Sequence, residues 1–321
     1  NAIINWVKQR YDLIVTKEVI NFVPGIVPGI GMAMNCFTQK GDKVMIQPPV
    51  YHPFAWVTTR NERTLVINPL RWENGMYRMD LDAFREQIKG CKLFILCNPH
   101  NPGGVVWTEA ELRAIADICY DEKVLVFSDE IHADLTLPPH THRPFATVSE
   151  KARMNSVTFM SPSKAFNMPG LSASHALIFN EDLRKRFRIY MDAGELDMGH
   201  VFAFLSVEAA YSHGTEWLDQ CLAYIQGNID FVDEFLKKHA PKIKAIRPEA
   251  SYLVWLDCRE LELSQKDLNE FFVDKAHLAL NDGEMFGKEG IGFMRLNVAS
   301  PRCIIEKAMK QLADAYQLYI K

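Results

Sequence analysis

Three short apolar runs lie close together in the chain, and a polar segment follows each of them. The runs cover residues 92–97, 124–127 and 156–160. Between the first two, the segment from Thr108 to Glu111 has the pattern of a capping box and predicts the start of a helix that ends near residue 120. Because a strand, a helix and a second strand at this spacing form a βαβ unit, we expect parallel neighbouring strands covered by helices on both faces.

The polar residues that follow these runs are the strongest functional signal. Asn101, Asp129 and Lys164 each lie at or just beyond the carboxyl end of a predicted strand. Open α/β sheets bind ligands at this edge. Lys164 sits among small hydroxyl residues, where a partly desolvated amine loses its proton readily and becomes a nucleophile. Alone, each residue has an ordinary structural explanation as a solvated lysine, a turn former or a turn acid. Their convergence is what indicates a site.

The rest of the chain predicts an α/β fold with two parts. Further strands are expected at 43–47, 65–68 and 175–179, and a long amphipathic helix at 216–238. After it come strands at 252–257 and 293–298 and helices at 265–275 and 301–316. We therefore expect a large domain, residues 1–214, with a mostly parallel sheet covered by helices. A linking helix and a smaller C-terminal α/β domain would form residues 215–321. Because the chain begins at Asn1, we also expect that an N-terminal segment is missing.

Composition excludes several classes of function. The net charge is −4 with scattered basic residues, which predicts no nucleic-acid partner. No apolar run approaches the ~20 residues that a membrane helix needs, so we expect no membrane partner and a cytoplasmic protein. The seven cysteines lack a Cys-x-x-Cys pair and indicate reduced thiols. His140, His142 and His132 lack a regular ligand spacing, and we expect no metal site.

Two further segments are candidates for ligand binding. The bend from Pro24 to Gly29 precedes an apolar stretch, and the start of a helix there would offer free N–H groups and a positive dipole end to a phosphate. A plain turn before a buried helix explains this segment equally well. Tyr51 follows the predicted strand at 43–47, although a single aromatic residue is more often part of a core.

Together, these candidates satisfy the needs of pyridoxal 5'-phosphate. A lysine binds its aldehyde, a carboxylate keeps its pyridine nitrogen protonated, an aromatic ring stacks on it, and an amide donates to its phenolic oxygen. Lys164, Asp129, Tyr51 and Asn101 are of the required types and occur at suitable positions. This cofactor is therefore the one that the sequence predicts.

Almost the whole chain resembles the fold type I pyridoxal phosphate enzymes of the aminotransferase class I/II superfamily. It resembles most its cystathionine beta-lyase branch, the MalY/PatB-type C–S lyases. The resemblance rests on six segments: Pro-Gly-Ile-Val-Pro-Gly at 24–29, Pro-Pro-Val-Tyr-His-Pro-Phe at 48–54, Cys-Asn-Pro-His-Asn-Pro-Gly-Gly at 97–104, Ser-Asp-Glu-Ile-His-Ala-Asp-Leu at 128–135, Ser-Pro-Ser-Lys-Ala-Phe-Asn-Met-Pro-Gly-Leu at 161–171 and Arg-Leu-Asn-Val-Ala-Ser-Pro-Arg at 295–302.

The resemblance implies a role for each matching residue. Lys164 would be the catalytic residue, which holds the cofactor covalently and moves a proton between the substrate Cα and the cofactor. Arg295 would bind the substrate α-carboxylate through its planar fork. The remaining cofactor contacts would be Asp129 at the pyridine nitrogen, Asn101 at the phenolic oxygen, Tyr51 on the ring, and Ser161, Ser163 and the amides of Ile26 and Val27 at the phosphate.

Two positions separate the branches of this superfamily. Many aminotransferases carry a tyrosine at the cofactor oxygen where this chain has His132, and an arginine at the phosphate where it has Ser172. Both differences resemble the lyase branch and favour β-elimination, with His132 as a further cofactor contact. The resemblance also implies a homodimer with shared active sites.

The function that we expect is a carbon–sulfur β-lyase. It would cleave cystathionine or a related S-substituted L-cysteine to a thiol, pyruvate and ammonia. An amino acid aminotransferase is the second reading, because it shares the first steps. A regulatory protein that keeps the fold with little turnover is the third, although the intact site argues against it. A hydride-transferring Rossmann enzyme is disfavoured by the missing Gly-x-Gly-x-x-Gly pattern.

Overall fold

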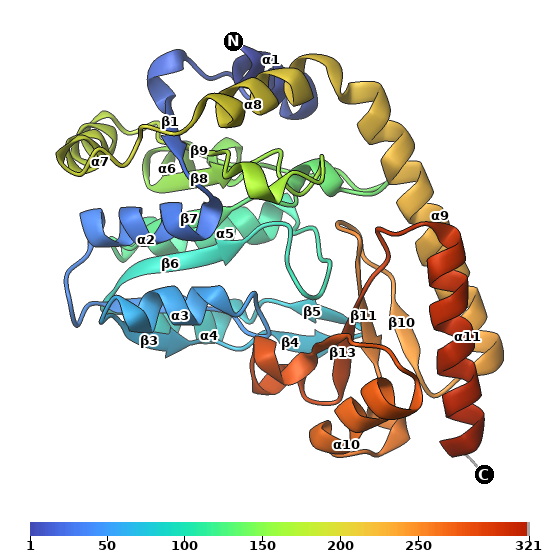
Figure 1. The fold of residues 1–321 in the computed structure, drawn as a ribbon. Coiled ribbons are helices and arrows are strands. Elements are labelled where there is room, and N and C mark those ends of the chain that lie inside the picture. The colour runs from blue at the N-terminus through green and yellow to red at the C-terminus, as the bar shows by residue number, and fades with distance from the viewer. Residues whose placement is uncertain (320–321) are drawn as a thin grey trace.

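The computed structural model describes residues 1–319 of the 321-residue chain and contains two main sheets. The larger has seven strands in the order β1-β9-β8-β7-β6-β2-β3, and the smaller has the order β10-β11-β13-β12 (Figure 1). The strands are β1 Ile20–Val23, β2 Lys43–Ile46, β3 Thr64–Ile67, β4 Arg71–Glu73, β5 Met76–Arg78, β6 Cys91–Cys97, β7 Leu125–Asp129, β8 Ser156–Met160, β9 Ser174–Leu177, β10 Lys244–Ile246, β11 Leu253–Asp257, β12 Asn281–Asp282 and β13 Phe293–Asn297. The α-helices are α1 Ala2–Tyr11, α2 Ile26–Phe37, α3 Pro53–Arg60, α4 Leu81–Gln87, α5 Glu109–Asp121, α6 Glu150–Met154, α7 Glu181–Ala193, α8 Val201–His213, α9 Thr215–His239, α10 Gln265–Glu270 and α11 Arg302–Tyr319.

The predicted mostly parallel sheet is confirmed. Strands β3, β2, β6, β7 and β8 pair in parallel, and the expected neighbours β6 and β7 pair from Leu93↔Leu125 to Cys97↔Asp129. Only β9 runs the other way, since it pairs antiparallel with both β8 and β1. The carboxyl ends of the other six strands therefore lie at one edge of this sheet.

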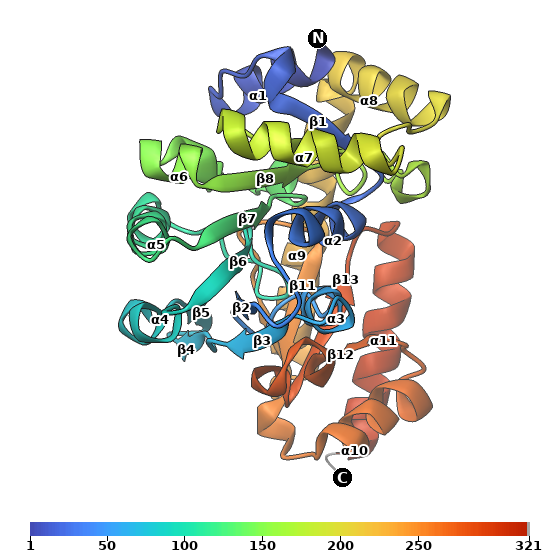
Figure 2. The same cartoon turned by 90° about the vertical axis from the view of Figure 1, so that its left-hand side faces the viewer.

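Helices cover both faces of the seven-stranded sheet, as its apolar strands require. Along β6, Leu93 and Ile95 pack with residues of α2, α3 and α7, whereas Phe94 and Leu96 pack with residues of α4 and α5. Figure 2 shows α2 and α3 on one side of the strands and α4 and α5 on the other. A strand that is buried on both faces needs apolar residues at every position, which explains the continuous runs in the sequence.

The predicted capping box at the start of α5 is also confirmed. The backbone N–H of Glu111 donates to Thr108 Oγ1 at 3.2 Å, and the N–H of Thr108 donates to Glu111 Oε2 at 2.8 Å. These bonds satisfy two N–H groups that a helix start leaves free. They fix the point at which the chain turns from the loop after β6 into α5.

The C-terminal sheet is antiparallel, and α9, α10 and α11 share its apolar core. The helix α9 passes from α8 to this sheet (Figure 1). The expected helix at 265–275 consists of α10 and a π-helical turn, Phe271–Lys275. The division at residue 214 stays a prediction. Within residues 1–319, no helix is both long and apolar enough to cross a membrane.

Candidate active site

A cavity of about 340 Å³ lies at the carboxyl ends of the parallel strands, between the two sheets. It brings together nearly all the residues that the sequence singled out. The predicted residues that line it are Ile26, Val27, Tyr51, Asn101, Asp129, His132, Ser163, Lys164 and Arg295. The tenth, Ser161, lies directly beneath this lining and bonds to Ser163. Proximity is established in this way, while the role of each residue stays a prediction.

Asp129 is the last residue of β7, and its side chain enters the cavity although only 4% of the residue is exposed. Its Oδ1 accepts one hydrogen bond, from the N–H of Ile131 at 3.0 Å. Burial raises the pKa of Asp129 to about 7, whereas this hydrogen bond and the Lys164 amine oppose the rise. A carboxylate in such surroundings gains from a cationic or N–H partner in the cavity.

The helix α2 begins at the cavity with Ile26, directly after Gly25, whose φ of 135° disfavours other residues. The N–H groups of Ile26 and Val27 belong to the first turn, which has no intrahelical acceptors for them. A Cβ at Gly29 would lie 2.9 Å from the Val23 side chain, so the glycine lets α2 approach β1 closely. The helix start at the cavity wall is therefore of the kind that can bind an anion.

Hydroxyl groups fix the turn that carries Lys164. Ser161 Oγ donates to the carbonyl of Ala173 at 2.8 Å and accepts from the N–H of Ser163 at 3.1 Å. The two serine hydroxyls lie 2.8 Å apart. Ser161 thus holds the turn in place, while Ser163 and Lys164 reach the cavity.

Arg295 enters the cavity from β13 of the other sheet. Its Nη1 donates to Asn101 Oδ1 at 2.9 Å and its Nη2 donates to Asn281 Oδ1 at 2.8 Å. Nε is buried without a partner among the described residues, and no described carboxylate forms an ion pair with this guanidinium. Burial lowers the pKa of Arg295 to about 10, which leaves it a cation at neutral pH. A half-buried cation without a protein counter-charge is suited to an anionic ligand.

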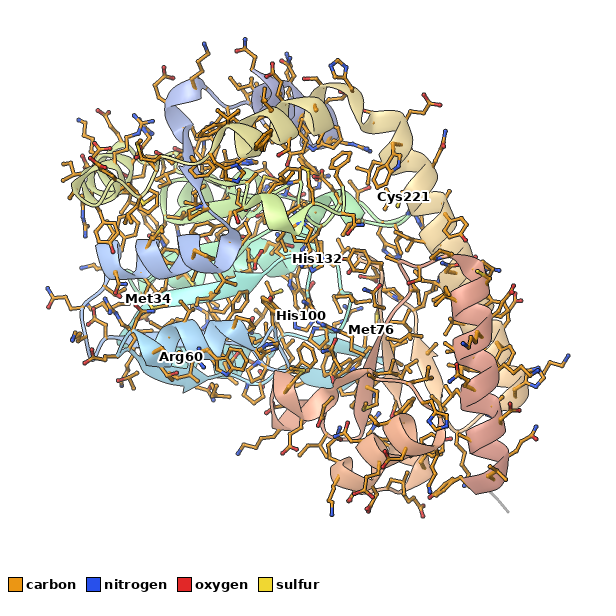
Figure 3. The ribbon with its side chains drawn as sticks, in the orientation of Figure 1. Met34, Arg60, Met76, His100, His132 and Cys221 are labelled. Atoms are coloured by element: carbon orange, nitrogen blue, oxygen red, sulfur yellow. The ribbon has the colours of Figure 1, made fainter. Side chains whose placement is uncertain are left out.

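His132 lies in the interior, on the side of the large sheet that faces the C-terminal strands (Figure 3). Its Nδ1 is buried and has no partner among the described residues. Burial lowers the pKa of His132 to about 3, and the nearby cations Lys164 and Arg295 act in the same direction. The imidazole is therefore neutral at physiological pH, and its Nδ1 can form one hydrogen bond with a ligand.

Six lining residues were not among the predicted site residues: Pro28, Cys97, Ile131, Tyr252, Leu253 and Asn297. Three of these carry polar side-chain atoms, namely Cys97, Tyr252 and Asn297. Asn297 follows Arg295 by two positions on β13, so the alternation of a strand places both on one face. This spacing could have revealed it. Cys97 ends β6 as Asp129 ends β7, but its apolar run made it resemble a core thiol. Tyr252 precedes β11 and reaches the cavity only through the packing of the two sheets, for which no local signal exists.

His140 and His142 each lie beside a different glutamate. His142 Nε2 lies 2.8 Å from Glu130 Oε2 in a buried pair, and His140 Nδ1 lies 3.7 Å from Glu249 Oε1. Within residues 1–319, no group of three or more histidine, cysteine, aspartate or glutamate side chains could hold a metal ion.

Comparison with known proteins identifies the family of this chain. The family model for aminotransferase class I and II matches residues 1–312. Cystathionine beta-lyase PatB of Bacillus subtilis is 38% identical over 317 residues, which cover 98% of this chain and 82% of PatB.

Solved structures of pyridoxal phosphate enzymes are also similar to this chain over almost its whole length. Cystalysin from Treponema denticola, which contains pyridoxal 5'-phosphate, superposes with a TM-score of 0.97 at 34% identity, over 100% of this chain and 82% of cystalysin. The PLP-bound C–S lyase from Staphylococcus hominis superposes with a TM-score of 0.91 at 33% identity, over 98% of this chain and 82% of that enzyme. The predicted superfamily and the fold of pyridoxal phosphate enzymes are confirmed, and the chain belongs to the aminotransferase class I and II family.

Proposed function

We propose that this protein is a pyridoxal phosphate-dependent carbon–sulfur β-lyase. It would cleave cystathionine or a related S-substituted L-cysteine to a thiol, pyruvate and ammonia. The observation that carries this proposal is the 38% identity to cystathionine beta-lyase PatB over 98% of the chain. The cavity supports the dependence on pyridoxal phosphate independently, because it holds the residue types that the cofactor needs.

The polar atoms of the cavity fit the cofactor. Arg295 Nε and His132 Nδ1 are buried without partners among the described residues, and the Asp129 carboxyl accepts a single hydrogen bond. Unpartnered buried polar atoms are costly unless a ligand satisfies them. The anion-binding start of α2 adds a place for a phosphate.

We assign the cofactor contacts as follows. Lys164 would hold the aldehyde carbon, Asp129 the ring nitrogen and Asn101 the phenolic oxygen. Tyr51 would stack on the ring and His132 would lie close to the phenolic oxygen. The phosphate would bind to the amides of Ile26 and Val27 and to Ser163, with Ser161 as support.

The chain's own residues suggest how the reaction proceeds. The guanidinium of Arg295 binds the α-carboxylate, and its bonds to Asn101 and Asn281 fix the plane of the fork. Lys164 Nζ takes the proton from Cα. When bound, pyridoxal phosphate acts as the electron sink for this step. The electron pair of the broken Cα–H bond forms the Cα=Cβ bond as the Cβ–S bond breaks. Lys164 can return its proton to the departing sulfur.

We also propose that the enzyme is a homodimer. Large apolar side chains are exposed at the start of α8 and just before it, with Met198, Val201 and Phe202 each at least 66% exposed. An apolar patch of this kind is typical of a protein interface. The seven free cysteines agree with a reducing compartment, and we propose that the enzyme acts in the cytoplasm.

The test is a product assay on protein loaded with pyridoxal phosphate. L-cystathionine or another cysteine S-conjugate is supplied without any keto acid, and pyruvate and free thiol are measured. We expect both products in equal amounts over many turnovers. An aminotransferase, which the family also includes, would instead need an added keto acid and transfer the amino group to it. That outcome would contradict the lyase assignment.

A further inference from the structure

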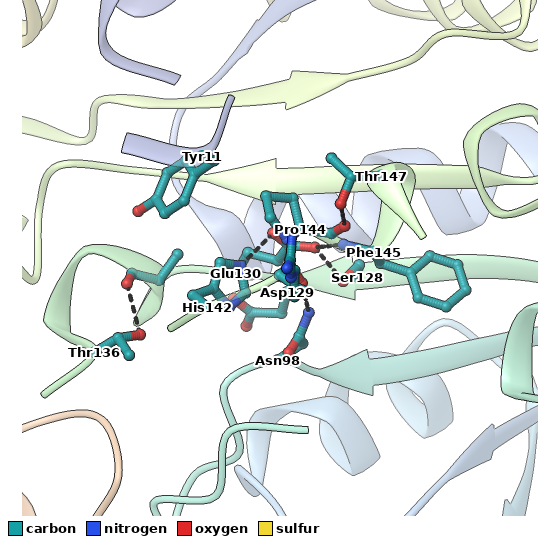
Figure 4. Close-up of polar contacts among 12 residues, drawn as sticks. Tyr11, Asn98, Ser128, Asp129, Glu130, Thr136, His142, Pro144, Phe145 and Thr147 are labelled. Carbon is teal, nitrogen blue, oxygen red and sulfur yellow. Dashed lines mark hydrogen bonds and ion pairs between the residues drawn. The ribbon is translucent and has the colours of Figure 1, made fainter. Parts of the chain in front are cut away.

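A buried polar cluster lies behind the site aspartate, and the proposed reaction does not use it. The Glu130 cluster consists of Ser128, Glu130, His142 and the backbone N–H of Phe145 (Figure 4). Glu130 Oε1 accepts from Ser128 Oγ and from Phe145 N, both at 2.8 Å, and Oε2 lies 2.8 Å from His142 Nε2. The Glu130 and His142 side chains are 0% and 1% exposed.

Hydrogen bonds hold the carboxyl group of Glu130 in one place. Ser128 Oγ and Phe145 N donate to Oε1, and His142 Nε2 lies within hydrogen-bond distance of Oε2. His142 Nδ1 has no partner among the described residues. The charge of the Glu130 carboxyl group acts on its neighbour Asp129, whose pKa it raises.

This charge is fixed close to the cavity. Glu130 directly follows Asp129, and an extended chain places consecutive side chains on opposite faces. Asp129 therefore faces the cavity while Glu130 points to the other side of the sheet. The N–H of Glu130 donates to the carbonyl of Phe159 at 2.8 Å, and the carbonyl of Asp129 accepts from the N–H of Asn98 at 2.9 Å. Both bonds fix the backbone that carries the two carboxyl groups.

Other titratable groups do not cancel the effect of Glu130 on Asp129. Lys164, Tyr51 and Cys97 face Asp129 in the cavity, and of these only the Lys164 amine is cationic. After burial, the charge of Glu130 is the main influence that raises the pKa of Asp129. On the far side of His142 lie the Tyr11 ring and Asp134, whose pKa is raised by burial although Arg10 and His142 both act to lower it.

We propose that Glu130 is a positioning residue for the cofactor: its fixed negative charge keeps the ring nitrogen that binds at Asp129 protonated. Two adjacent carboxylates attract a proton more strongly than one, and a protonated ring is the stronger electron sink. This inference rests on the proposed cofactor, but not on whether the reaction is β-elimination or transamination.

The test follows the ring nitrogen itself rather than turnover. The holoenzyme is prepared with pyridoxal phosphate that carries ¹⁵N in the pyridine ring, and the ¹⁵N chemical shift is recorded by NMR from pH 6 to pH 9. We expect the wild-type nitrogen to stay protonated over this range. In Glu130→Gln the titration should move down by about one pH unit or more. The amide keeps the size of the side chain and can bond to the other tautomer of His142.

Two variants separate the charge of Glu130 from its packing. Asp134→Asn removes another buried carboxyl group of the same segment, which bonds to Trp6 and Tyr11 instead. It should lower stability without moving the ¹⁵N titration. Glu130→Asp keeps the charge and should titrate like the wild type.

The proposal is overturned if Glu130→Gln leaves the titration unchanged or if Asp134→Asn moves it equally. A wild-type nitrogen that is unprotonated at pH 8 overturns it without any variant. Absence of a bound ¹⁵N signal in the wild type would instead reject the proposed cofactor.

Discussion

The cavity and the Glu130 cluster lie on opposite sides of the same strand end, and their carboxyl groups differ in how many hydrogen bonds the protein supplies to them. In the cluster, both oxygens of Glu130 have hydrogen-bond donors within the protein. In the cavity, Arg295 Nε and His132 Nδ1 lack partners among the described residues, and Asp129 is held by a single backbone N–H. Both regions are buried, so burial alone does not explain the difference.

The difference indicates where the ligand binds. A polar group that the chain satisfies itself can position its neighbours, whereas one left without a partner depends on a ligand for its hydrogen bonds. On this account, loss of a cavity residue should affect binding or turnover more than stability. Changes to groups that the protein satisfies internally should affect stability first.

The largest effect is expected for Lys164→Ala. Removal of the amine eliminates the group that takes the Cα proton, and turnover should fall by about 10⁴-fold. Pyruvate release measures this loss, and circular dichroism should show an unchanged fold. A variant that retains a tenth of the wild-type rate would mean that another residue is the base.

Arg295→Lys should have the next largest effect. A lysine keeps the charge but loses the fork that also contacts Asn101 and Asn281. We expect kcat/KM to fall by roughly 100-fold, mainly through a higher KM for the amino acid. Steady-state kinetics measure both constants. An unchanged KM with a lower kcat would argue against a role in carboxylate binding.

Asp129→Asn tests whether a residue placed for ligand binding lowers the free energy of unfolding of the cofactor-free protein. In the cofactor-free protein, burial raises the pKa of Asp129 from 3.8 to about 7. The folded state therefore binds the proton more tightly than the unfolded state, and the free energy of unfolding should fall as the pH rises between these values. At pH 8 the variant should melt a few degrees higher than the wild type, and at pH 4 it should not. Thermal melts at the two pH values would contradict the account if they showed no difference.

His132→Gln should have a smaller effect on kinetics. Because the pKa of His132 is lowered to about 3, the imidazole is neutral from pH 5 to pH 8. Loss of one neutral hydrogen bond should lower kcat/KM by less than about tenfold. The pH profile in this range should keep its shape. A wild-type inflection that disappears in the variant would show that His132 titrates during turnover.

Thr108→Ala tests the contrasting case of a region whose polar groups are hydrogen-bonded within the protein, the capping box at the start of α5. This substitution removes the capping hydrogen bond at the start of α5 and should cost about 1 kcal/mol of the free energy of unfolding. Chemical denaturation measures this cost. Turnover should be unchanged in the folded protein, and a loss of activity would mean that α5 positions the site.

The sequence predicted the parallel strands because each of β6, β7 and β8 is buried on both faces, which requires a continuous apolar run. It did not reveal β1, β10 or β12. Strand β12 has two residues and β10 has three, too few for a periodic pattern. Strand β1 depends on its pairing with β9, more than 150 residues away, as in Ile20↔Leu177.

The residues of the candidate site also fall into two groups, those that the sequence could predict and those that it could not. Asn101, Asp129 and Lys164 could be predicted because topology alone places strand ends together. Tyr252 could not, because it enters the cavity from the second sheet. The environment of His142 was also hidden, since a histidine in a proline-rich loop resembles an exposed residue until the fold brings it to Glu130.

The most direct test of this account is to locate the cofactor on the chain. The protein is incubated with pyridoxal phosphate and reduced with borohydride, and its peptides are analysed by mass spectrometry. The account predicts one modified residue, Lys164, and predicts that a cysteine S-conjugate added before reduction prevents its modification. Modification of other lysines instead, or none at all, would contradict the assignment of this cavity as the active site.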